Sequence, residues 1–305
     1  MNKMVIISGP TAVGKTDISI KLAKRIGGEI ISADSVQVYK GLDVGSAKIT
    51  EEEMQGVKHY LIDCLEPTDN FDVSVFKDMA KAAAAEIYAK GKIPIIVGGT
   101  AFYIQALLYD IDFSEEEHDN SYRDEMNKYD EQYLHDLLKQ VDPEYAADVH
   151  MNNKKRVIRA LEYNHFTGKK FSAYNAEQAK REAIYDFSYF VLNDKRERLY
   201  ERIDRRVDIM AKNGLVEEVS RLRDSNLGRD LVSMQGIGYK EIYSYLEGEI
   251  SLEKALEDIK KNTRHFAKRQ LTWFRHEDSV IFINKDEFDY DDDKIVEFMI
   301  NGVNL

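Results

Sequence analysis

The stretch "VIISGPTAVGKTDIS", residues 5–19, decides the fold class of this 305-residue chain. An apolar run typical of a buried strand breaks at a glycine, and a segment with helical patterning follows. Between them, residues 9–16 match the pattern G-x-x-x-x-G-K-[ST], which binds phosphate when it lies between a strand and a helix. The stretch therefore predicts a phosphate-binding loop in an α/β sheet.

Strands and helices continue to alternate after this loop. Residues 28–35 and 93–100 are predicted strands, the first reaching Asp34 and the second ending in a Gly-Gly-Thr turn. Residues 74–92 lie before the second strand and form a predicted helix. This alternation predicts a parallel sheet flanked by helices, with its functional loops at the carboxyl ends of the strands.

The alternation stops near residue 112 and resumes near residue 186, which divides the chain. Residues 1–112 and 186–305 are predicted to form a P-loop NTPase-like α/β core, because strand patterns return at 186–193 and 279–284. Residues 113–185 carry charged amphipathic patterns without a strand, so we expect an inserted all-helical domain there.

Composition narrows the class of protein. The formal net charge of −12 argues against a surface that binds nucleic acid everywhere. Residues 152–162, 194–206 and 260–276 are nevertheless locally basic, so one face could hold a polyanion. A single cysteine excludes an internal disulfide, and no run approaches the roughly 18 apolar residues of a membrane span. We expect a cytoplasmic protein without a membrane partner, and nothing requires more than a monomer.

The phosphate loop suits a diphosphate. Backbone amides of the loop and of the following helix N-terminus would hold the anion, Lys15 would neutralise its oxygens, and the Thr16 hydroxyl would bind Mg²⁺. The predicted diphosphate-binding residues are Gly9, Pro10, Thr11, Ala12, Val13, Gly14, Lys15 and Thr16.

A carboxylate stands in an unusual place for this class. Nucleotide-hydrolysing relatives hold their metal with an aspartate after an apolar strand. Here the apolar strand "PIIVGGT", residues 94–100, ends in glycine, and the acid is Asp34 after the preceding strand. Asp34 is therefore a candidate general base acting on an acceptor. A cap for a helix, or support for a metal ligand, is the alternative role.

Seven stretches in order resemble the bacterial tRNA dimethylallyltransferases, the tRNA isopentenyltransferase family. They span about residue 3 to about residue 276, and their combination carries the resemblance. The stretches are "GPTAVGKT", "ISADSVQVYKGLDVGSAK", "IIVGGTAFYIQAL", "KKRVIRALEYNHFTGKKFS", "RLYERIDRRVDIMAKNGLVEEV", "SMQGIGYKE" and "TRHFAKRQLTWFR".

The resemblance implies a specific reaction. A dimethylallyl group would pass from dimethylallyl diphosphate to the exocyclic amine of an adenosine beside the anticodon of tRNA, with diphosphate as the leaving group. The implied partners are the anticodon stem-loop of tRNA and dimethylallyl diphosphate, and the implied cofactor is Mg²⁺. These requirements agree with the chemistry, because an allylic diphosphate ionises once its leaving charge is stabilised.

The resemblance also assigns site residues. Asp34 matches the general base, Thr100 matches a threonine that lines the channel where the substrates meet, and Arg206 matches an arginine that contacts the diphosphate. Stretches that match tRNA-contacting segments comprise Asp34, Ser35, Val36, Gln37, Lys155, Arg156, Val157, Ile158 and Arg159.

Two of these basic segments have alternative structural explanations. The side chains Arg198, Arg202 and Arg206 recur every four residues and could form a solvated helix edge, paired with Glu197, Glu201 and Asp204. Arg159 could pair with Glu162. The rings of Phe266, Trp273 and Phe274 suggest RNA contacts, although helical spacing favours core packing for at least two of them.

Three other functions remain open from the residues alone. A transferase acting on free adenine nucleotides would share the loop and the base, but would not need a helical insertion or extended basic stretches. A small-molecule kinase would place ATP in the loop and use Asp34 to activate a hydroxyl. A nucleotide-dependent RNA-binding switch would not need a carboxylate opposite the loop.

Overall fold

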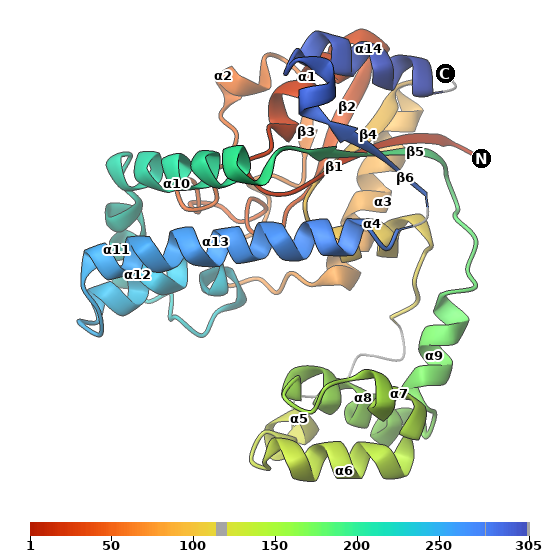
Figure 1. The fold of residues 1–305 in the computed structure, drawn as a ribbon, viewed down its shortest axis with the longest axis vertical. Helices are drawn as coiled ribbons and strands as arrows, with labels where there is room; N and C mark the ends of the chain where they lie inside the picture. Colours follow the sequence, from red (N-terminus) through yellow and green to blue (C-terminus); the bar gives the residue numbers. More distant parts are fainter. Residues whose placement is uncertain (114–120, 278, 304–305) are drawn as a thin grey trace. The chain divides into compact units, whose positions relative to one another are not determined.

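The computed structural model describes residues 1–113, 121–277 and 279–303 and has two compact units (Figure 1). The core unit comprises Met1–Leu108 and Tyr185–Leu305, and the insertion unit comprises Tyr109–Ile184. The chain therefore leaves the core unit once and returns to it.

A six-stranded parallel sheet forms the centre of the core unit, which confirms the predicted fold class. The strand order β3-β2-β4-β1-β5-β6 makes β1 and β4 central. β3 was not predicted, because two residues are too few to show a period. The strands are β1 (Lys3–Ser8), β2 (Gly28–Ala33), β3 (His59–Tyr60), β4 (Ile93–Gly98), β5 (Asp186–Asn193) and β6 (Val280–Asn284).

Helices cover both faces of the sheet. Successive side chains of a central strand point to opposite faces, and apolar side chains on both faces need to be covered. On one face, α1 (Lys15–Ile26) packs against α14 (Asp292–Gly302), and α3 (Val73–Ala89) packs with α4 (Ala101–Leu108) on the other (Figure 1). The acidic segment near the C-terminus thus leads into a helix that sequence patterning did not predict. Asp291 caps this helix, which buries apolar residues in the main core.

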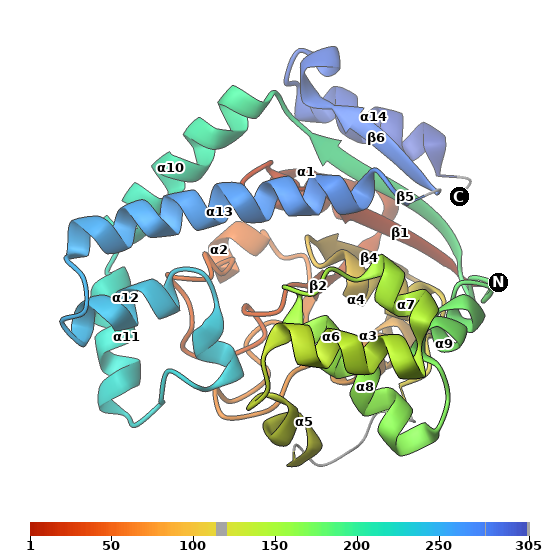
Figure 2. The same cartoon turned by 60° about the horizontal axis from the view of Figure 1, so that its bottom comes forward.

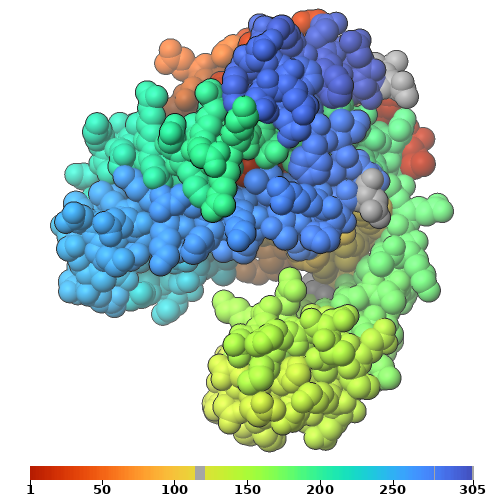
Figure 3. Space-filling view, in the orientation of Figure 1, coloured from red at the N-terminus to blue at the C-terminus, as the bar shows by residue number. Residues whose placement is uncertain are grey.

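The helices that follow β5 form a group beyond the carboxyl ends of the strands (Figures 1 and 2). They are α10 (Arg196–Lys212), α11 (Leu215–Asp224), α12 (Tyr239–Leu246) and α13 (Leu252–Phe274). α10 and α13 lie side by side at the surface (Figure 3). Short helical segments are α2 (Glu51–Met54), η2 (Val232–Gln235) and η3 (Lys285–Phe288). Across the described ranges of the chain, no helix combines the length and apolarity needed to cross a membrane.

The described residues of the insertion unit form helices joined by turns, with no strand among them. Its helices are α5 (Ser121–Met126), α6 (Glu131–Val141), α7 (Pro143–Asp148), α8 (Lys154–Thr167) and α9 (Phe171–Gln178). Leu134 and Leu138 of α6 pack against Val157 and Leu161 of α8. The unit therefore has an apolar core of its own.

Strands β2 and β4 approach each other closely at their carboxyl ends, where the predicted functional loops begin. Ala33 of β2 and Ser8 of β1 both pair in register with Gly98 of β4. A Cβ atom at Gly98 would lie 2.2 Å from the backbone oxygen of Ala33, so only glycine fits there. The Ser8 hydroxyl also donates to the Gly98 carbonyl at 2.6 Å. These contacts bring the loops after β2, β4 and β1 together.

The Gly98→Ala variant is expected to lower the free energy of unfolding by about 2–3 kcal/mol, because the added methyl group meets backbone that cannot move freely. Urea denaturation measures this change. Gly228→Ala is the matched control, because a Cβ at Gly228 meets no atom within 4 Å. A Gly98→Ala protein as stable as the Gly228→Ala protein would contradict the close-approach argument.

Candidate active site

Three loops meet at the carboxyl edge of the sheet, in the order set by β2, β4 and β1. Asp34 directly follows β2, Thr100 follows β4 after one further glycine, and Gly9 directly follows β1. Because β4 lies between the other two strands, the turn with Thr100 lies between the loop of Asp34 and the phosphate loop. The structure thus brings together the predicted base, channel threonine and diphosphate loop.

The diphosphate loop, residues 9–16, ends at the N-terminus of α1. Gly9 and Gly14 have φ of 139° and 97°, values that favour glycine. A Cβ at Gly9 would also lie 2.5 Å from the carbonyl oxygen of Leu192. The amides of Lys15 and Thr16 are among the first of α1 and have no partner within the helix, so the helix end presents donors to an anion.

Not every predicted loop residue can contribute an amide. Pro10 has no N–H, the Thr11 N–H donates to Gln270 Oε1 at 3.0 Å, and the Val13 N–H points to the Pro10 carbonyl at 3.4 Å. The Val13 side chain is buried in the main core. The structure therefore removes Pro10, Thr11 and Val13 from the predicted set of amide donors.

Several cations surround the diphosphate loop. Lys15 Nζ donates to the carbonyl oxygens of Gly9 and Pro10, each at 2.9 Å. Burial, together with the positive charge of Arg206, lowers the pKa of Lys15 to about 7, although the charge of Asp34 opposes the shift. Burial likewise lowers the pKa of Arg206, with Asp34 opposing and Arg202 adding to the shift. A site with this excess of buried positive charge favours a polyanionic ligand.

Two further cations of this cluster were not assigned a binding role from the sequence. Arg202 Nε donates to the Ala12 carbonyl at 2.7 Å, so it holds the loop directly. Lys285 lies almost fully buried beside Gly14 and pairs with Asp292 at 3.0 Å. The alternative of a solvated arginine edge on α10 is thus wrong for Arg202 and for the largely enclosed Arg206.

The Asp34 carboxylate is held by the turn that follows β2 through one of its two oxygens. Its Oδ1 atom accepts from the Val36 and Gln37 amides at 2.9 and 3.2 Å, which caps the turn after β2. Its other carboxylate oxygen accepts no hydrogen bond from the residues that the structure describes. One oxygen is therefore fixed by the backbone, and the second is available for a proton.

The loop that begins at Asp34, residues 34–48, is held from α11. Glu218 is 3% exposed and accepts from the Asp43, Val44 and Gly45 amides at 2.7 to 3.0 Å. Its carboxylate also accepts from the Tyr239 hydroxyl at 2.9 Å. This network fixes the far end of the loop, so the exposed Ser35 and the half-buried side chains of Val36 and Gln37 lie on an ordered segment.

The same loop is connected to α10. Gln37 Nε2 donates to the carbonyl oxygens of Ser46 and Ala47 at 3.3 and 3.4 Å. Arg206 Nη2 donates to the Ala47 carbonyl at 3.5 Å. Gln37, from the predicted tRNA-contacting stretch, and Arg206, predicted to contact the diphosphate, thus both donate to the Ala47 carbonyl.

Gln270 of α13 joins the diphosphate loop to the turn that carries Thr100. Its side chain is 6% exposed, accepts from the Thr11 amide at 3.0 Å and donates to the Gly99 carbonyl at 2.9 Å. A Cβ at Gly99 would lie 2.0 Å from Gln270 Nε2, so the contact requires glycine. Gln270 therefore fixes the spacing between two of the three loops.

The donors present fit a magnesium ion that arrives with a diphosphate. Mg²⁺ usually binds through one or two protein oxygens, substrate phosphates and water. The exposed Thr16 hydroxyl lies in the first turn of α1, and Asp34 lies close enough to influence the pKa of the neighbouring Lys15. In residues 1–113, 121–277 and 279–303 no three His, Cys, Asp or Glu side chains group to hold a metal, so the substrate would supply most ligands.

The predicted basic stretch of the insertion requires a correction. Val157 and Ile158 are 0% and 2% exposed and belong to the apolar core, so their side chains are not exposed for contact with tRNA. Lys155 and Arg156 are exposed at the start of α8. Arg159 pairs with Glu162 at 3.2 Å, as the alternative interpretation expected.

Gln270 and Glu218, which hold the loops of the site, were not predicted, although each lies on the apolar face of its helix. Gln270 lies three residues after Ala267 and four before Phe274 on the buried stripe of α13. Glu218 has the same relation to Leu215 and Leu222 on α11. A polar residue on an apolar helical stripe needs a partner, so this pattern could have identified both residues.

Binding of dimethylallyl diphosphate, the ligand implied by the resemblance, is expected to take up about one proton per site at pH 8. Free Lys15, with a pKa of about 7, is then mostly neutral, and the bound anion raises its pKa. Affinity should therefore fall as the pH rises above 7. Titration calorimetry in buffers of different ionisation enthalpy measures the uptake. The Lys15→Arg variant should show no proton uptake, because arginine is charged in both the free and the bound state. A binding enthalpy of the unaltered protein that is the same in every buffer would contradict proton uptake by Lys15.

The Gln270→Leu variant is expected to raise the Kd for dimethylallyl diphosphate about tenfold, because the Thr11 amide and Gly99 carbonyl lose their partner. The Kd for RNA should stay unchanged. A general loss of structure would instead weaken binding of both ligands. Glu257→Gln, an exposed change on the same helix, is the control. Equal diphosphate affinity in the two variants would show that Gln270 does not position the loop.

Comparisons with known proteins identify the family of the chain. A family model described as IPP transferase matches residues 37–277. A tRNA dimethylallyltransferase from Lachnoclostridium phytofermentans is 56% identical over 98% of this chain and 97% of its own. The crystal structure of a tRNA isopentenylpyrophosphate transferase from Bacillus halodurans has a TM-score of 0.75 at 44% identity, covering 99% of this chain and 96% of that chain. A eukaryotic dimethylallyltransferase acting on tRNA has a TM-score of 0.81 at 31% identity, covering 93% and 74%. The chain therefore belongs to the IPP transferase family.

Proposed function

We propose that the protein transfers a dimethylallyl group from dimethylallyl diphosphate to the exocyclic amine of an adenosine adjacent to the anticodon in tRNA. The observation that carries this proposal is the order of the three loops at the sheet edge. A cationic diphosphate loop, the turn with Thr100 and a carboxylate with one available oxygen follow β1, β4 and β2 in neighbouring positions. The names of two similar proteins support it: one is a tRNA dimethylallyltransferase, and the other is a eukaryotic dimethylallyltransferase acting on tRNA.

The arrangement supports cleavage of an allylic diphosphate. The bond between the allylic carbon and the diphosphate oxygen breaks, and both bonding electrons leave with the diphosphate. Lys15, Arg202 and Arg206 and the amides at the start of α1 stabilise that charge. Thr16 is the residue that would hold Mg²⁺, and the ion would supply further positive charge beside the leaving group.

The acceptor side needs a base. The lone pair of the adenine amine forms the new carbon–nitrogen bond, and the nitrogen then carries an extra proton. The available oxygen of Asp34 accepts this proton. Thr100, between the two loops, lines the space in which the donor carbon and acceptor nitrogen meet.

Two features favour tRNA over a free nucleotide. Lys155 and Arg156 are exposed cations on an insertion unit with its own core, and a free nucleotide would not require such a unit. Contacts across many phosphates are needed to hold an anticodon stem-loop. A kinase is less favoured, because β4 ends in glycine where this class holds its metal with an aspartate.

The purified protein, incubated with Mg²⁺ and radiolabelled dimethylallyl diphosphate, tests the acceptor. We expect label on unmodified tRNA at an adenosine of the anticodon loop, and none on adenosine monophosphate. Label on the mononucleotide alone would keep the chemistry and overturn the RNA acceptor. Label on neither, with consumption of ATP, would overturn the transferase assignment in favour of a kinase.

The Asp34→Asn variant is expected to lower kcat at least about 100-fold, because the amide still caps the turn but cannot take the proton. The Kd for tRNA, measured by filter binding, should remain nearly unchanged. Asp78→Asn, an exposed change on α3, is the control and should transfer at the normal rate. Unaltered turnover of the Asp34→Asn protein would remove the base assignment.

A further inference from the structure

A lysine near the C-terminal end of the chain lies beside the diphosphate loop. Lys285 directly follows β6, and its side chain is almost fully buried. A Cβ atom at Gly14 would lie 3.2 Å from Lys285 Nζ and 3.4 Å from Arg202 Nη2, so two cations converge on one loop residue. We infer that Lys285 is a further residue of the diphosphate site and supplies positive charge to the leaving group across Gly14. This inference rests on the proposed function and adds to it a charge from the C-terminal segment.

Unused hydrogen-bond donors on Lys285 support this role. An ammonium group carries three N–H donors, and a buried donor without an acceptor costs free energy. Within the part of the chain that the structure describes, Lys285 Nζ donates to Asp292 Oδ1 alone, at 3.0 Å. The ammonium group therefore keeps donors for the oxygens of an anion bound in the adjacent loop.

Side-chain hydrogen bonds at the ends of β5 and β6 hold Lys285 in place. Asn193 of β5 and Asn284 of β6 pair in register, and Asn193 Nδ2 donates to Asn284 Oδ1 at 2.9 Å. Asn284 Nδ2 in turn donates to Glu287 Oε1 of η3 at 2.9 Å. Because β5 lies between β6 and β1, the residue that follows β6 is fixed at the same edge of the sheet as the diphosphate loop.

Helix α14 positions the carboxylate that pairs with Lys285. Asp292 is the first residue of α14, and this helix packs against α1, which begins at the end of the diphosphate loop. On the exposed side, ion pairs join the two helices: Lys21 with Asp293 at 3.0 Å and Arg25 with Glu297 at 2.7 Å. The partner of Lys285 is therefore held by the helix that carries the loop amides.

The ion pair presents its positive end to the loop. The Lys285 side chain is 7% exposed and that of Asp292 is 24% exposed, so the ammonium group is the more buried end. A buried ion pair contributes little net stability, because desolvation of both charges opposes their attraction. A buried cation beside an anion site acts strongly, however, on negative charge that develops there. The orientation of the pair therefore suits stabilisation of the departing diphosphate.

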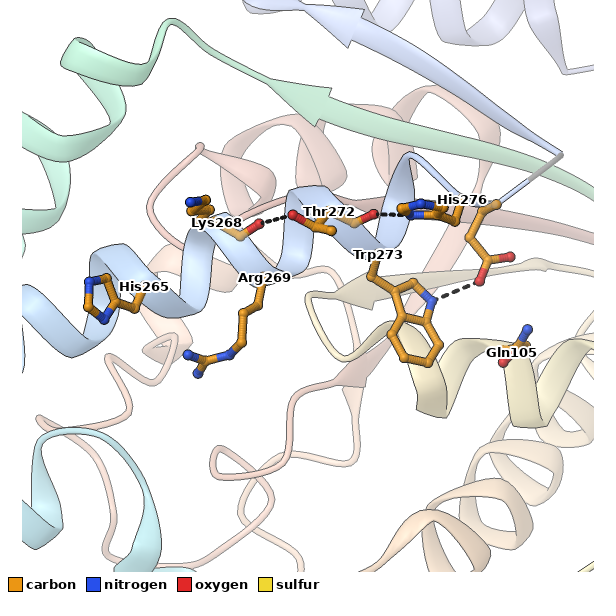
Figure 4. A pocket seen from close by; sticks show the side chains of 8 residues that line it. Gln105, His265, Lys268, Arg269, Thr272, Trp273 and His276 are labelled. Carbon is orange, nitrogen blue, oxygen red and sulfur yellow. Dashed lines mark hydrogen bonds between the residues drawn. The ribbon is translucent and has the colours of Figure 1, made fainter. Parts of the chain in front are cut away.

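Other cations of the core unit lie on a different surface. Lys268 and Arg269 of α13 are exposed and line a pocket of about 810 Å³, which Gln105 of α4 also lines (Figure 4). Lys285 differs from them, because it is buried and contacts the loop at Gly14. Lys268 is therefore a suitable control for a general loss of positive charge.

Removal of the charge at position 285 tests the inference. Lys285→Met is expected to raise the Kd for inorganic diphosphate about 5- to 10-fold, measured by titration calorimetry with Mg²⁺ and without RNA. Lys285→Arg, which keeps the charge, should restore most of the affinity. Two controls should bind normally: Lys268→Met, and Lys294→Met, an exposed change on α14 that frees Asp289. Equal affinity of Lys285→Met and the controls would overturn the inference.

The Asp292→Asn variant separates the charge of Lys285 from mere structural support. It removes the opposing negative charge, so it is expected to bind inorganic diphosphate about two- to threefold more tightly. Weakening as large as that of Lys285→Met would show that the pair only joins two elements, and would overturn the role of its charge. In steady-state transfer, Lys285→Met should raise the KM for dimethylallyl diphosphate and leave the KM for tRNA unchanged. Equal thermal midpoints of all variants exclude unfolding.

The two proposals fail in different ways. Normal diphosphate affinity of Lys285→Met, in a protein that labels tRNA, overturns the role of Lys285 alone. Failure of the unaltered protein to label tRNA overturns the proposed function. Binding of inorganic diphosphate needs no RNA, so the effect of Lys285→Met on that binding is measured independently of the acceptor.

Discussion

The register of β2, β4 and β1 is the constraint on which the site depends. Gly98 pairs with both Ala33 and Ser8, and its missing side chain lets the β2 backbone approach. Each functional loop begins one or two residues beyond this point, so a shift in register would separate the base from the diphosphate loop. The positions of the three loops therefore depend on backbone geometry that allows only glycine at position 98.

Positively charged side chains surround the loop that this geometry positions. Lys15, Arg202 and Arg206 gather around the diphosphate loop, with Lys285 enclosed behind Gly14. Burial lowers the pKa of Lys15 and of Arg206, so the protein holds this arrangement at a cost in stability. A bound polyanion offsets that cost, which links the affinity of the site to the charge of its ligand.

The helices after β5 keep the loops in place from outside the sheet. Glu218 of α11 fixes residues 43–45, Gln270 of α13 bonds to Thr11 and Gly99, and Arg202 of α10 holds the carbonyl of Ala12. The outward side of α13 also exposes Lys268 and Arg269. One helix thus supports the loops of the site on its buried side and carries exposed cations on its other side.

Local patterns in the sequence determined the parallel sheet, the diphosphate loop and the position of Asp34, because strand periodicity, the spacing of Gly9, Gly14 and Lys15, and a carboxylate after a strand are all short-range features. Tertiary structure alone decided which helix residues support the loops and which face solvent. Val157 and Ile158 lie in a basic stretch, yet packing buries them, while Gln270 and Glu218 lie on apolar stripes yet bond to loops far away in the chain. Burial and partnership depend on contacts between residues distant in sequence, and no local period encodes those contacts.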